Sequence, residues 1–344
     1  MLAVITMMIA ISFFMVSCDS GTKSTSEEAT EETTMVETTP DFQISLAQWS
    51  LHKSFFGPGL GGDWAAFGRA LQEDPESLLQ GELNPDDFPT IAAGYGVNSI
   101  ELVNTFYFDK AENTEYWDEF LKKCDAAGVK VGLIMCDALG NLGDADSAAR
   151  MAAVENHYKW VDAAKYLGAH SIRVNAAGQG TAEEQAANAV DGLTKLGEYG
   201  ASKGINIIVE NHGGHSSNGK WLSGVMKEVG MDNVGTLPDF GNFCVKSGPD
   251  GCEEEYDRYQ GMAELMPYAK GVSAKSHGFD ESGNEVDMDY VRIMQIVKDS
   301  GFKGYVGIEY EGSELSEDEG IKATKALLER AFAEVAGDDQ EASL

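Results

Sequence analysis

The sequence predicts an α/β fold, a single (β/α)₈ barrel of eight parallel strands that alternate with helices. Eight short runs rich in apolar and β-branched residues recur along the chain, and helix-patterned stretches lie between them. The runs are continuous rather than alternating, which is typical of parallel strands buried on both faces. The 344 residues are enough, because such a barrel commonly needs about 250 residues. An open doubly wound sheet is the alternative, but no GxGxxG sequence opens a helix after an early strand.

The predicted strands and helices follow one another in regular order. The strands are expected at Ile44–Ala47, Asn98–Val103, Lys130–Cys136, Ser171–Asn175, Ile205–Val209, Val234–Leu237, Gly271–Ala274 and Gly304–Ile308. The helices are expected at Glu115–Ala127, Ala148–Leu167, Glu183–Lys203, Leu222–Val229, Tyr256–Ala269, Asp289–Ser300 and Gly320–Ala336. Several helices are followed by a glycine just before the next strand, which is the expected C-terminal stop: Gly128, Gly168, Gly204 and Gly301.

The longest interval separates the first two predicted strands. It contains the glycine-rich stretch 57–62 and a helical piece, and it leads to Asp87-Phe88-Pro89. We interpret this insertion as a lid or rim over one end of the barrel.

The N-terminal segment is expected to direct export. Residues 2–16 are almost wholly apolar and lead to Cys18; this run is shorter than a membrane span of about 20 residues and is typical of a signal peptide. We therefore expect residues 1–18 to be a lipoprotein-type signal. Lipidation of Cys18 would anchor the exported chain in a bacterial envelope, on the periplasmic side or at the cell surface, and would be its one membrane contact. A packed N-terminal helix is the alternative.

The next segment predicts a disordered acidic tether. Residues 19–41 are rich in Ser, Thr and Glu, with seven acids and one lysine, and they lack the apolar residues that would offset the entropy of ordering. The sequence thus places the barrel at residues 42–337 and an acidic tail at residues 338–344.

The overall charge and the cysteines narrow the function classes. The chain has 57 acidic and 25 basic residues, a formal net charge of −32, which argues against a nucleic-acid partner. None of the five cysteines forms a CxxC pair, which argues against a zinc ribbon or a thioredoxin-like motif. Cys244 and Cys252 could pair in an oxidising compartment, but we favour two free, partly buried thiols. The sequence leaves open whether the chain forms an oligomer.

Acidic residues stand where the predicted strands end, which is where a parallel barrel builds its active site. Glu210 follows the fifth strand, Asp239 the sixth and Glu309 the eighth. Three carboxylates at one mouth would repel one another, and a divalent cation would relieve that repulsion. The sequence therefore predicts a metal site. Oxygen-rich ligation with one imidazole suits Mn²⁺, Mg²⁺ or Co²⁺ at least as well as Zn²⁺.

The imidazole of that site has two candidates. His277 continues the seventh strand, whereas His212 lies two residues after Glu210 and shares its side of the strand. We favour His277 as the fourth ligand, and His212 is the alternative.

Other residues near the same mouth are candidates for binding a substrate. Trp49 could stack on a sugar ring, and His52 lies in the loop after the first strand; packing or a structural role is the alternative for both. The remaining candidates stand at strand ends: Glu101, Arg173, Asn175, His212, Asn242 and Lys275.

The segments VENHGG, LPDFGNF, VSAKSHGF and GYVGIEYEG resemble the xylose-isomerase-like, sugar phosphate isomerase/epimerase superfamily of TIM barrels. The resemblance runs from the first strand to the last helix. The segments IELVN, HYKWVDAAKYLGAHSIRVN and WLSGVMKEVG look like a lipoprotein-borne branch of this superfamily.

The resemblance implies a ligand set and a mechanism. In the epimerases of the superfamily, one divalent metal is held by Glu, Asp, His and Glu, which match Glu210, Asp239, His277 and Glu309; the histidine could instead align nearer Ser273. Glu210 and Glu309 would then act as base and acid on either side of a hydroxy-ketone, with a metal-stabilised enediolate between the two proton transfers. Lys275, Arg173, His212 and Asn175 would hold substrate oxygens, and Asn242 stands where the epimerases often carry histidine.

Three functions remain open. The leading hypothesis is a metal-dependent sugar isomerase or epimerase. The second is a lyase or hydrolase of 3-keto glycosides, because proton abstraction beside a carbonyl can also expel a leaving group. The third is a non-catalytic carbohydrate-binding lipoprotein. An unphosphorylated substrate is expected in each case, since the loop at residues 310–319 has five acids and no base where such barrels often bind phosphate.

Overall fold

The computed structural model describes residues 42–341. The predicted signal, the tether, lipidated Cys18 and the last residues of the predicted acidic tail lie outside these residues. Within them, no helix combines the length and the apolar character that crossing a membrane requires.

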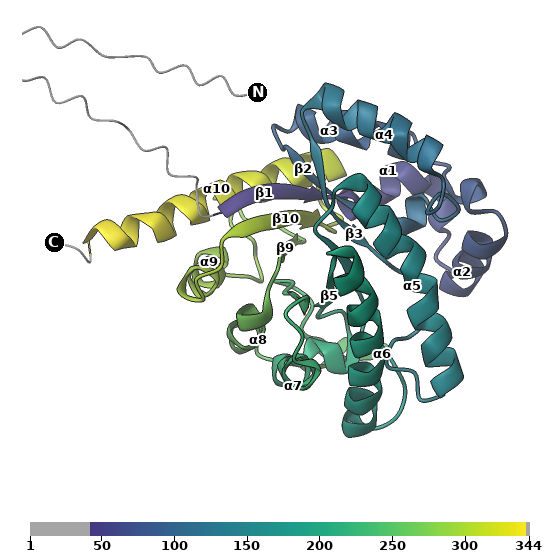
Figure 1. Cartoon of the computed structure of the whole chain (residues 1–344). Coiled ribbons are helices and arrows are strands. Elements are labelled where there is room, and N and C mark those ends of the chain that lie inside the picture. The colour runs from purple at the N-terminus through teal and green to yellow at the C-terminus, as the bar shows by residue number, and fades with distance from the viewer. Residues whose placement is uncertain (1–41, 342–344) are drawn as a thin grey trace, which may run out of the picture. The chain divides into compact units, whose positions relative to one another are not determined.

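Eight parallel strands form a nearly closed barrel, which confirms the predicted fold class (Figure 1). They are β1 (Phe42–Ala47), β2 (Ser99–Val103), β3 (Lys130–Met135), β4 (Ser171–Val174), β5 (Asn206–Glu210), β6 (Val234–Leu237), β9 (Val272–Ser276) and β10 (Gly304–Tyr310). The strand order is β6-β5-β4-β3-β2-β1-β10-β9, so the first strand β1 also pairs with the last strand β10. Parallel bridges join Thr236 to Ala269 and Asp239 to Ser273, so the chain after β6 also meets β9 and its approach.

Helices cover the outside of the strands (Figure 1). They are α1 (His52–Phe56), α2 (Trp64–Glu73), α3 (Phe88–Gly94), α4 (Thr114–Ala127), α5 (Ser147–Leu167), α6 (Ala182–Lys203), α7 (Gly219–Val229), α8 (Arg258–Leu265), α9 (Tyr290–Asp299) and α10 (Glu317–Glu341). Gly128, Gly168 and Gly204 end their helices in the left-handed conformation, as predicted. The last helix runs to Glu341, beyond the predicted end at Ala336.

The insertion between β1 and β2 folds into α1, α2, α3 and short 3₁₀ turns. The Asp63 side chain caps α2 by accepting hydrogen bonds from the amides of Ala65 and Ala66. Phe67 and Leu71 on α2 are buried, and the Phe67 ring packs edge-on against Phe56 of α1. Side chains of α2 line a cavity at the barrel mouth, so the predicted rim is confirmed.

A hairpin that the sequence did not predict follows β6. It consists of the antiparallel strands β7 (Cys244–Gly248) and β8 (Gly251–Glu255). Cys244 and Cys252 form a disulfide across it, so the prediction of two free thiols is wrong. The turn of the hairpin brings the Cα atoms of these two cysteines to 5.7 Å from each other, which their spacing alone did not reveal. Cys124 and Cys136 are free and buried.

Candidate active site

Three carboxylates meet at the carboxyl ends of the strands. Glu210 is the last residue of β5, Asp239 follows β6, and Glu309 lies near the end of β10. All three are buried, and one ligand atom from each lies within 4.8 Å of those of the others. The structure thus brings together the three acids that the sequence singled out.

The negative charge of these three carboxyl groups, when ionised, exceeds the positive charge of the side chains around them. Burial raises the pKa of Glu210 to about 7, and the Arg173 charge only partly offsets that effect. Burial likewise raises the pKa of Asp239 to about 7, against the opposing charge of Lys275. Burial therefore disfavours ionisation of these two carboxyls, and a further cation would favour it.

Lys275 on β9 lies among the acids. Its Nζ is 3.4 Å from Glu309 Oε1, 3.2 Å from Glu311 Oε1 and 3.9 Å from Asp239 Oδ2. Burial alone would lower the pKa of Lys275, but Glu309 and Asp239 raise it well above its ordinary value. Lys275 is thus a permanent charge beside two of the three clustered carboxylates.

Arg173 on β4 makes a second buried ion pair with the cluster. Its Nε is 2.9 Å from Glu210 Oε2, and its Nη1 donates to Asp137 Oδ1 at 2.7 Å. Asn175 Nδ2 also donates to Asp137, at 2.8 Å. Burial alone would raise the pKa of Asp137, but Arg173 lowers it below its ordinary value. Asp137 therefore holds Arg173 and Asn175 at the mouth of the barrel. The sequence predicted that these two residues lie there, but it did not identify Asp137.

Two functional candidates were missed by sequence reasoning. Asp137 comes directly after the apolar run of β3, and Glu311 comes one residue after β10 ends. Glu210 and Asp239 were predicted because each is an acid just beyond a predicted strand end. Asp137 and Glu311 have the same position, so the same criterion could have identified them.

The predicted histidine ligand, His277, lies apart from the acid cluster. His277 lies beyond the end of β9, its side chain is exposed, and the cluster found among the described residues consists of the three acids without it. Side chains alternate along a strand, so Ser273 and Lys275 share the inward face. Ser273 Oγ lies 2.6 Å from Asp239 Oδ2 and 2.8 Å from Glu309 Oε2. Ser273 therefore occupies the inward position between Asp239 and Glu309.

Asparagines fix the other carboxylate oxygens. Asn242 Nδ2 donates to Glu210 Oε1 at 2.9 Å, and the Asn242 amide donates to Asp239 Oδ1 at 2.9 Å. Asn211 accepts a hydrogen bond from the Asp239 amide at 2.7 Å and donates to its carbonyl at 3.0 Å. The loop after β6 is thus tied to the end of β5.

Glu101 on β2 is a fourth buried acid near the cluster. The Ser45 hydroxyl donates to its Oε1 at 2.6 Å, whereas Oε2 has no hydrogen-bond partner among the described residues. Burial raises the pKa of Glu101 to about 8, and the charges of Glu309 and Glu210 add to that effect. Glu101 therefore retains its proton at neutral pH.

A cavity of about 500 Å³ opens over these strand ends. Its lining includes Trp49 and His52, whose rings stack with centroids 4.7 Å apart, and His212, which the sequence predicted as a substrate contact. His52 Nδ1 lies 2.6 Å from the carbonyl oxygen of Trp49, which fixes the ring. The other lining residues are Leu60, Trp64, Phe67, Gly68, Leu71, Thr105, Asp137, Ala138, Arg173, Glu309 and Glu311.

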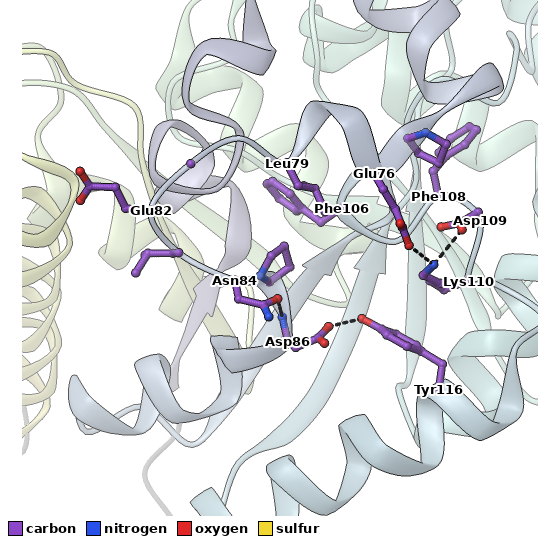
Figure 2. A pocket seen from close by; sticks show the side chains of 14 residues that line it. Glu76, Leu79, Glu82, Asn84, Asp86, Phe106, Phe108, Asp109, Lys110 and Tyr116 are labelled. Atoms are coloured by element: carbon purple, nitrogen blue, oxygen red, sulfur yellow. Dashed lines mark hydrogen bonds and ion pairs between the residues drawn. The ribbon is translucent and has the colours of Figure 1, made fainter.

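Another pocket, of about 460 Å³, lies between the insertion and the β2–α4 loop and shares no lining residue with this cavity. Figure 2 shows that several of its polar groups are paired: Lys110 Nζ is 2.6 Å from Glu76 and 2.8 Å from Asp109, and Tyr116 bonds Asp86. These groups are already satisfied, so the strand-end cavity is the better candidate site.

The donor set of the acid cluster fits a divalent cation. Three buried carboxylates converge, two of them have raised pKa values, and carboxylate oxygens are preferred ligands of hard divalent ions. Glu210, Asp239 and Glu309 would hold such an ion.

A sequence model of the family described as Xylose isomerase-like TIM barrel matches residues 89–331. The chain belongs to this family. The barrel, the strand-end acids and the cavity described above are therefore those of a xylose isomerase-like TIM barrel.

Solved structures of similar fold include sugar epimerases and a zinc-bound protein. L-ribulose 3-epimerase is 15% identical, with a TM-score of 0.61 over 88% of this chain and 98% of its own. The IOLI protein with a bound zinc atom is 14% identical, with a TM-score of 0.62 over 85% and 99%. The 3-keto-D-glucoside 4-epimerase of E. coli is 13% identical, with a TM-score of 0.57 over 72% and 94%. These TM-scores show that the fold is shared.

One curated relative matches in part. The C-glycoside deglycosidase alpha subunit of Arthrobacter globiformis is 36% identical over 77 residues, which are 21% of this chain and 22% of that protein. The chain thus matches about a fifth of the length of this relative.

Proposed function

We propose that this xylose isomerase-like barrel is a divalent-metal-dependent isomerase or epimerase of a carbohydrate, acting by proton abstraction next to a carbonyl. The observation that carries the proposal is the convergence of Glu210, Asp239 and Glu309, within 4.8 Å, at the carboxyl ends of the barrel strands. The epimerases among proteins of similar fold support it.

The proposed roles follow from the contacts. Glu210, Asp239 and Glu309 hold the cation, which when bound polarises a carbonyl oxygen. Glu210 and Glu309 also exchange the proton of the adjacent carbon, one removing it and the other returning it. Arg173 contacts Glu210 and Lys275 contacts Glu309, and these two cations orient the carboxylates and substrate oxygens.

An unphosphorylated substrate is part of the proposal. The loop and helix start after β10 carry Glu311, Glu314, Glu317, Asp318 and Glu319, and this acidic segment would repel a phosphate. Faster turnover of a sugar phosphate than of its free sugar would contradict this choice.

A lyase or hydrolase of 3-keto glycosides is the second candidate. The partial match to a C-glycoside deglycosidase subunit favours it, and so does the similar fold of a 3-keto-D-glucoside 4-epimerase. The same proton abstraction serves both reactions, and they differ in whether a leaving group departs.

The decisive experiment replaces the proton-transfer residues. Glu309→Gln and Glu210→Gln should each lower turnover by about 100-fold or more, because positioned acid–base groups contribute about 10²–10⁴-fold. Ketoses, aldoses and 3-keto glycosides would be screened with Mn²⁺, Mg²⁺, Co²⁺ or Zn²⁺ restored. Deuterium uptake without a leaving group indicates epimerisation, and a released aglycone indicates the lyase.

The matched control for these variants is Glu119→Gln, an exposed residue on α4. It should retain full activity, and the melting temperatures of all variants should show that the fold is intact. Full activity of both active-site variants would contradict the mechanism. Sugar binding without turnover in the native protein would instead favour the non-catalytic binding lipoprotein.

We also propose that the chain is exported and lipid-anchored at Cys18 in the bacterial envelope. The disulfide between Cys244 and Cys252 supports an oxidising compartment, where such bonds persist. Cell fractionation of the full chain and of Cys18→Ala tests this. The native chain should need detergent for release and the variant should not; equal membrane retention would contradict the anchor.

A further inference from the structure

The cavity over the strand ends has two chemically different walls. Arg173, His212, Glu309 and Glu311 supply charged or polar groups from the ends of the barrel strands. The opposite side of the same cavity is formed by α2 and by Leu60 just before it, and the residues there are apolar: Leu60, Trp64, Phe67, Gly68 and Leu71. We call these five residues the apolar wall. A ligand that fills the cavity therefore meets both kinds of surface.

Two residues of the apolar wall are buried, whereas Trp64 is open to solvent. Phe67 and Leu71 are the buried ones, and the Trp64 ring packs edge-on against Phe67 with centroids 5.7 Å apart. The Trp64 side chain is nevertheless 62% exposed. Because Trp64 also lines the cavity, its exposed ring is accessible to a ligand that fills the cavity.

A free sugar matches only half of this cavity. Its hydroxyls suit the carboxylates and the guanidinium at the strand ends, but hydroxyls placed against Leu60 and Leu71 would lose hydrogen bonds with water. The volume of about 500 Å³ lies within the range of about 300–1,000 Å³ that is typical of drug-sized ligands. The cavity thus suits a molecule with a sugar at one end and an apolar ring at the other.

We infer that the substrate is a keto-glycoside with an aromatic aglycone, the sugar lying at the strand-end acids and the aglycone against the apolar wall, chiefly on Trp64. This inference rests on the proposed function, which requires a carbonyl beside the reacting carbon. If the reaction is the elimination catalysed by a lyase, two bonds break: the C–H bond next to the ketone and the bond from the anomeric carbon to the aglycone. A C=C bond forms, the aglycone leaves with the electron pair and takes up a proton, and no redox partner is needed.

The experiment compares two 3-keto-glucosides that differ only in the aglycone, methyl and 4-nitrophenyl. The native protein should show the higher kcat/KM for the 4-nitrophenyl glycoside. Trp64→Ala should lower the ratio of the two kcat/KM values by about tenfold, which corresponds to about 1.4 kcal/mol of lost contact. Trp64→Phe, which keeps a flat ring, should restore most of the ratio.

Tyr166→Ala is the matched control. Tyr166 is an exposed aromatic residue of α5 that is not among the residues lining the cavity, so its removal should leave the ratio unchanged. An unchanged ratio in Trp64→Ala would overturn the inference. Equal kcat/KM values for the 4-nitrophenyl glycoside and a 3-keto disaccharide would also overturn it, because the wall would then accept a second sugar.

A binding measurement separates this inference from the proposed function. Calorimetry with unoxidised 4-nitrophenyl and methyl glucosides needs no turnover. If Trp64→Ala weakens binding of the aryl glucoside alone while no substrate is turned over, the aglycone site stands and the proposed reaction fails. If turnover occurs with equal preference for both glycosides, the proposed reaction stands and the aglycone site fails.

Discussion

The unpaired oxygen of Glu101 has a measurable consequence for stability. Burial raises the pKa of Glu101 from 4.5 to about 8, so the folded chain retains a proton that the unfolded chain releases between these pH values. Stability must therefore fall as the pH rises through this window. Below it both states are protonated, and above it both are ionised.

Replacing Glu101 with Gln removes this dependence. The Gln oxygen can still accept the Ser45 hydrogen bond, and the amide cannot ionise. We expect Glu101→Gln to gain melting temperature relative to the native protein between pH 5 and pH 8. The gain should grow steadily between pH 5 and pH 8, since the folded chain must hold the proton ever more strongly against its release in the unfolded chain.

Melting curves of metal-free protein from pH 5 to pH 9 measure this gain. The exposed variant Glu119→Gln should follow the native curve at every pH. A Tm difference between Glu101→Gln and the native chain that does not change with pH would show that Glu101 is ionised throughout.

At the residue scale, the sequence indicated the positions of the acids more clearly than that of the histidine. Glu210, Asp239 and Glu309 each end or follow an apolar strand, and that position alone places them at the mouth. His277 lies one residue beyond the end of β9, and the inward positions of that strand are Ser273 and Lys275. A strand end inferred from sequence is uncertain by one or two residues, so whether His277 belongs to the strand could not be predicted.

The contacts of Ser273 with two carboxylates illustrate a second reason why parts of the site could not be predicted from the sequence. Its single hydroxyl hydrogen can serve only one of the two carboxylates that lie within 2.8 Å of it. Without a metal, the other contact is favourable only when that carboxyl carries a proton. Such a shared arrangement depends on three strands meeting, and no pattern along one strand reveals it.

At the element scale, the regular parts of the fold were predictable and the hairpin was not. Strands and helices repeat with apolar runs and glycine stops, so their positions agree with the structure to within a few residues. The strand β8 is exposed along its whole length, so it carries no apolar pattern to detect. The sequence signal in this segment was the pair of cysteines, one in each strand of the hairpin.

The disulfide of this hairpin should contribute to stability. Closing a loop of eight residues is worth about 2–3 kcal/mol in the chain-entropy description. Reduction, or the double change Cys244→Ser and Cys252→Ser, should lower Tm by roughly 4–8 °C. The hairpin follows Asn242, which holds Glu210, so we also expect weaker metal binding in the reduced protein.

Calorimetric scans with and without dithiothreitol test the disulfide. The double serine variant should be insensitive to the reductant, because the other two cysteines of residues 42–341 are buried and already free. If dithiothreitol leaves the Tm of the native chain unchanged, the bond does not form or does not stabilise the fold.

At the scale of the whole molecule, negative charge is the dominant feature. Residues 42–344 carry 50 acidic and 24 basic residues, and two of the basic ones, Arg173 and Lys275, are buried at the acid cluster. Most of the remaining excess lies on the surface, where salt screens it over about 10 Å at 0.1 M ionic strength. Cations can thus stabilise this protein in two ways, by general screening and by binding at the three carboxylates.

The two effects can be separated by one variant. In metal-free protein, Mn²⁺ at about 100 times its Kd should add about 2.7 kcal/mol of stability, or roughly 5–10 °C in Tm. Asp239→Asn removes one charge of the cluster at nearly constant shape and should abolish that gain, while NaCl should still raise the Tm of both proteins.

The Mn²⁺ gain should also grow between pH 6 and pH 8, because the carboxyls of Glu210 and Asp239, with pKa values raised to about 7, must lose their protons to bind metal. An equal response of the native protein and Asp239→Asn to Mn²⁺ at every pH would mean that the ion acts only by screening.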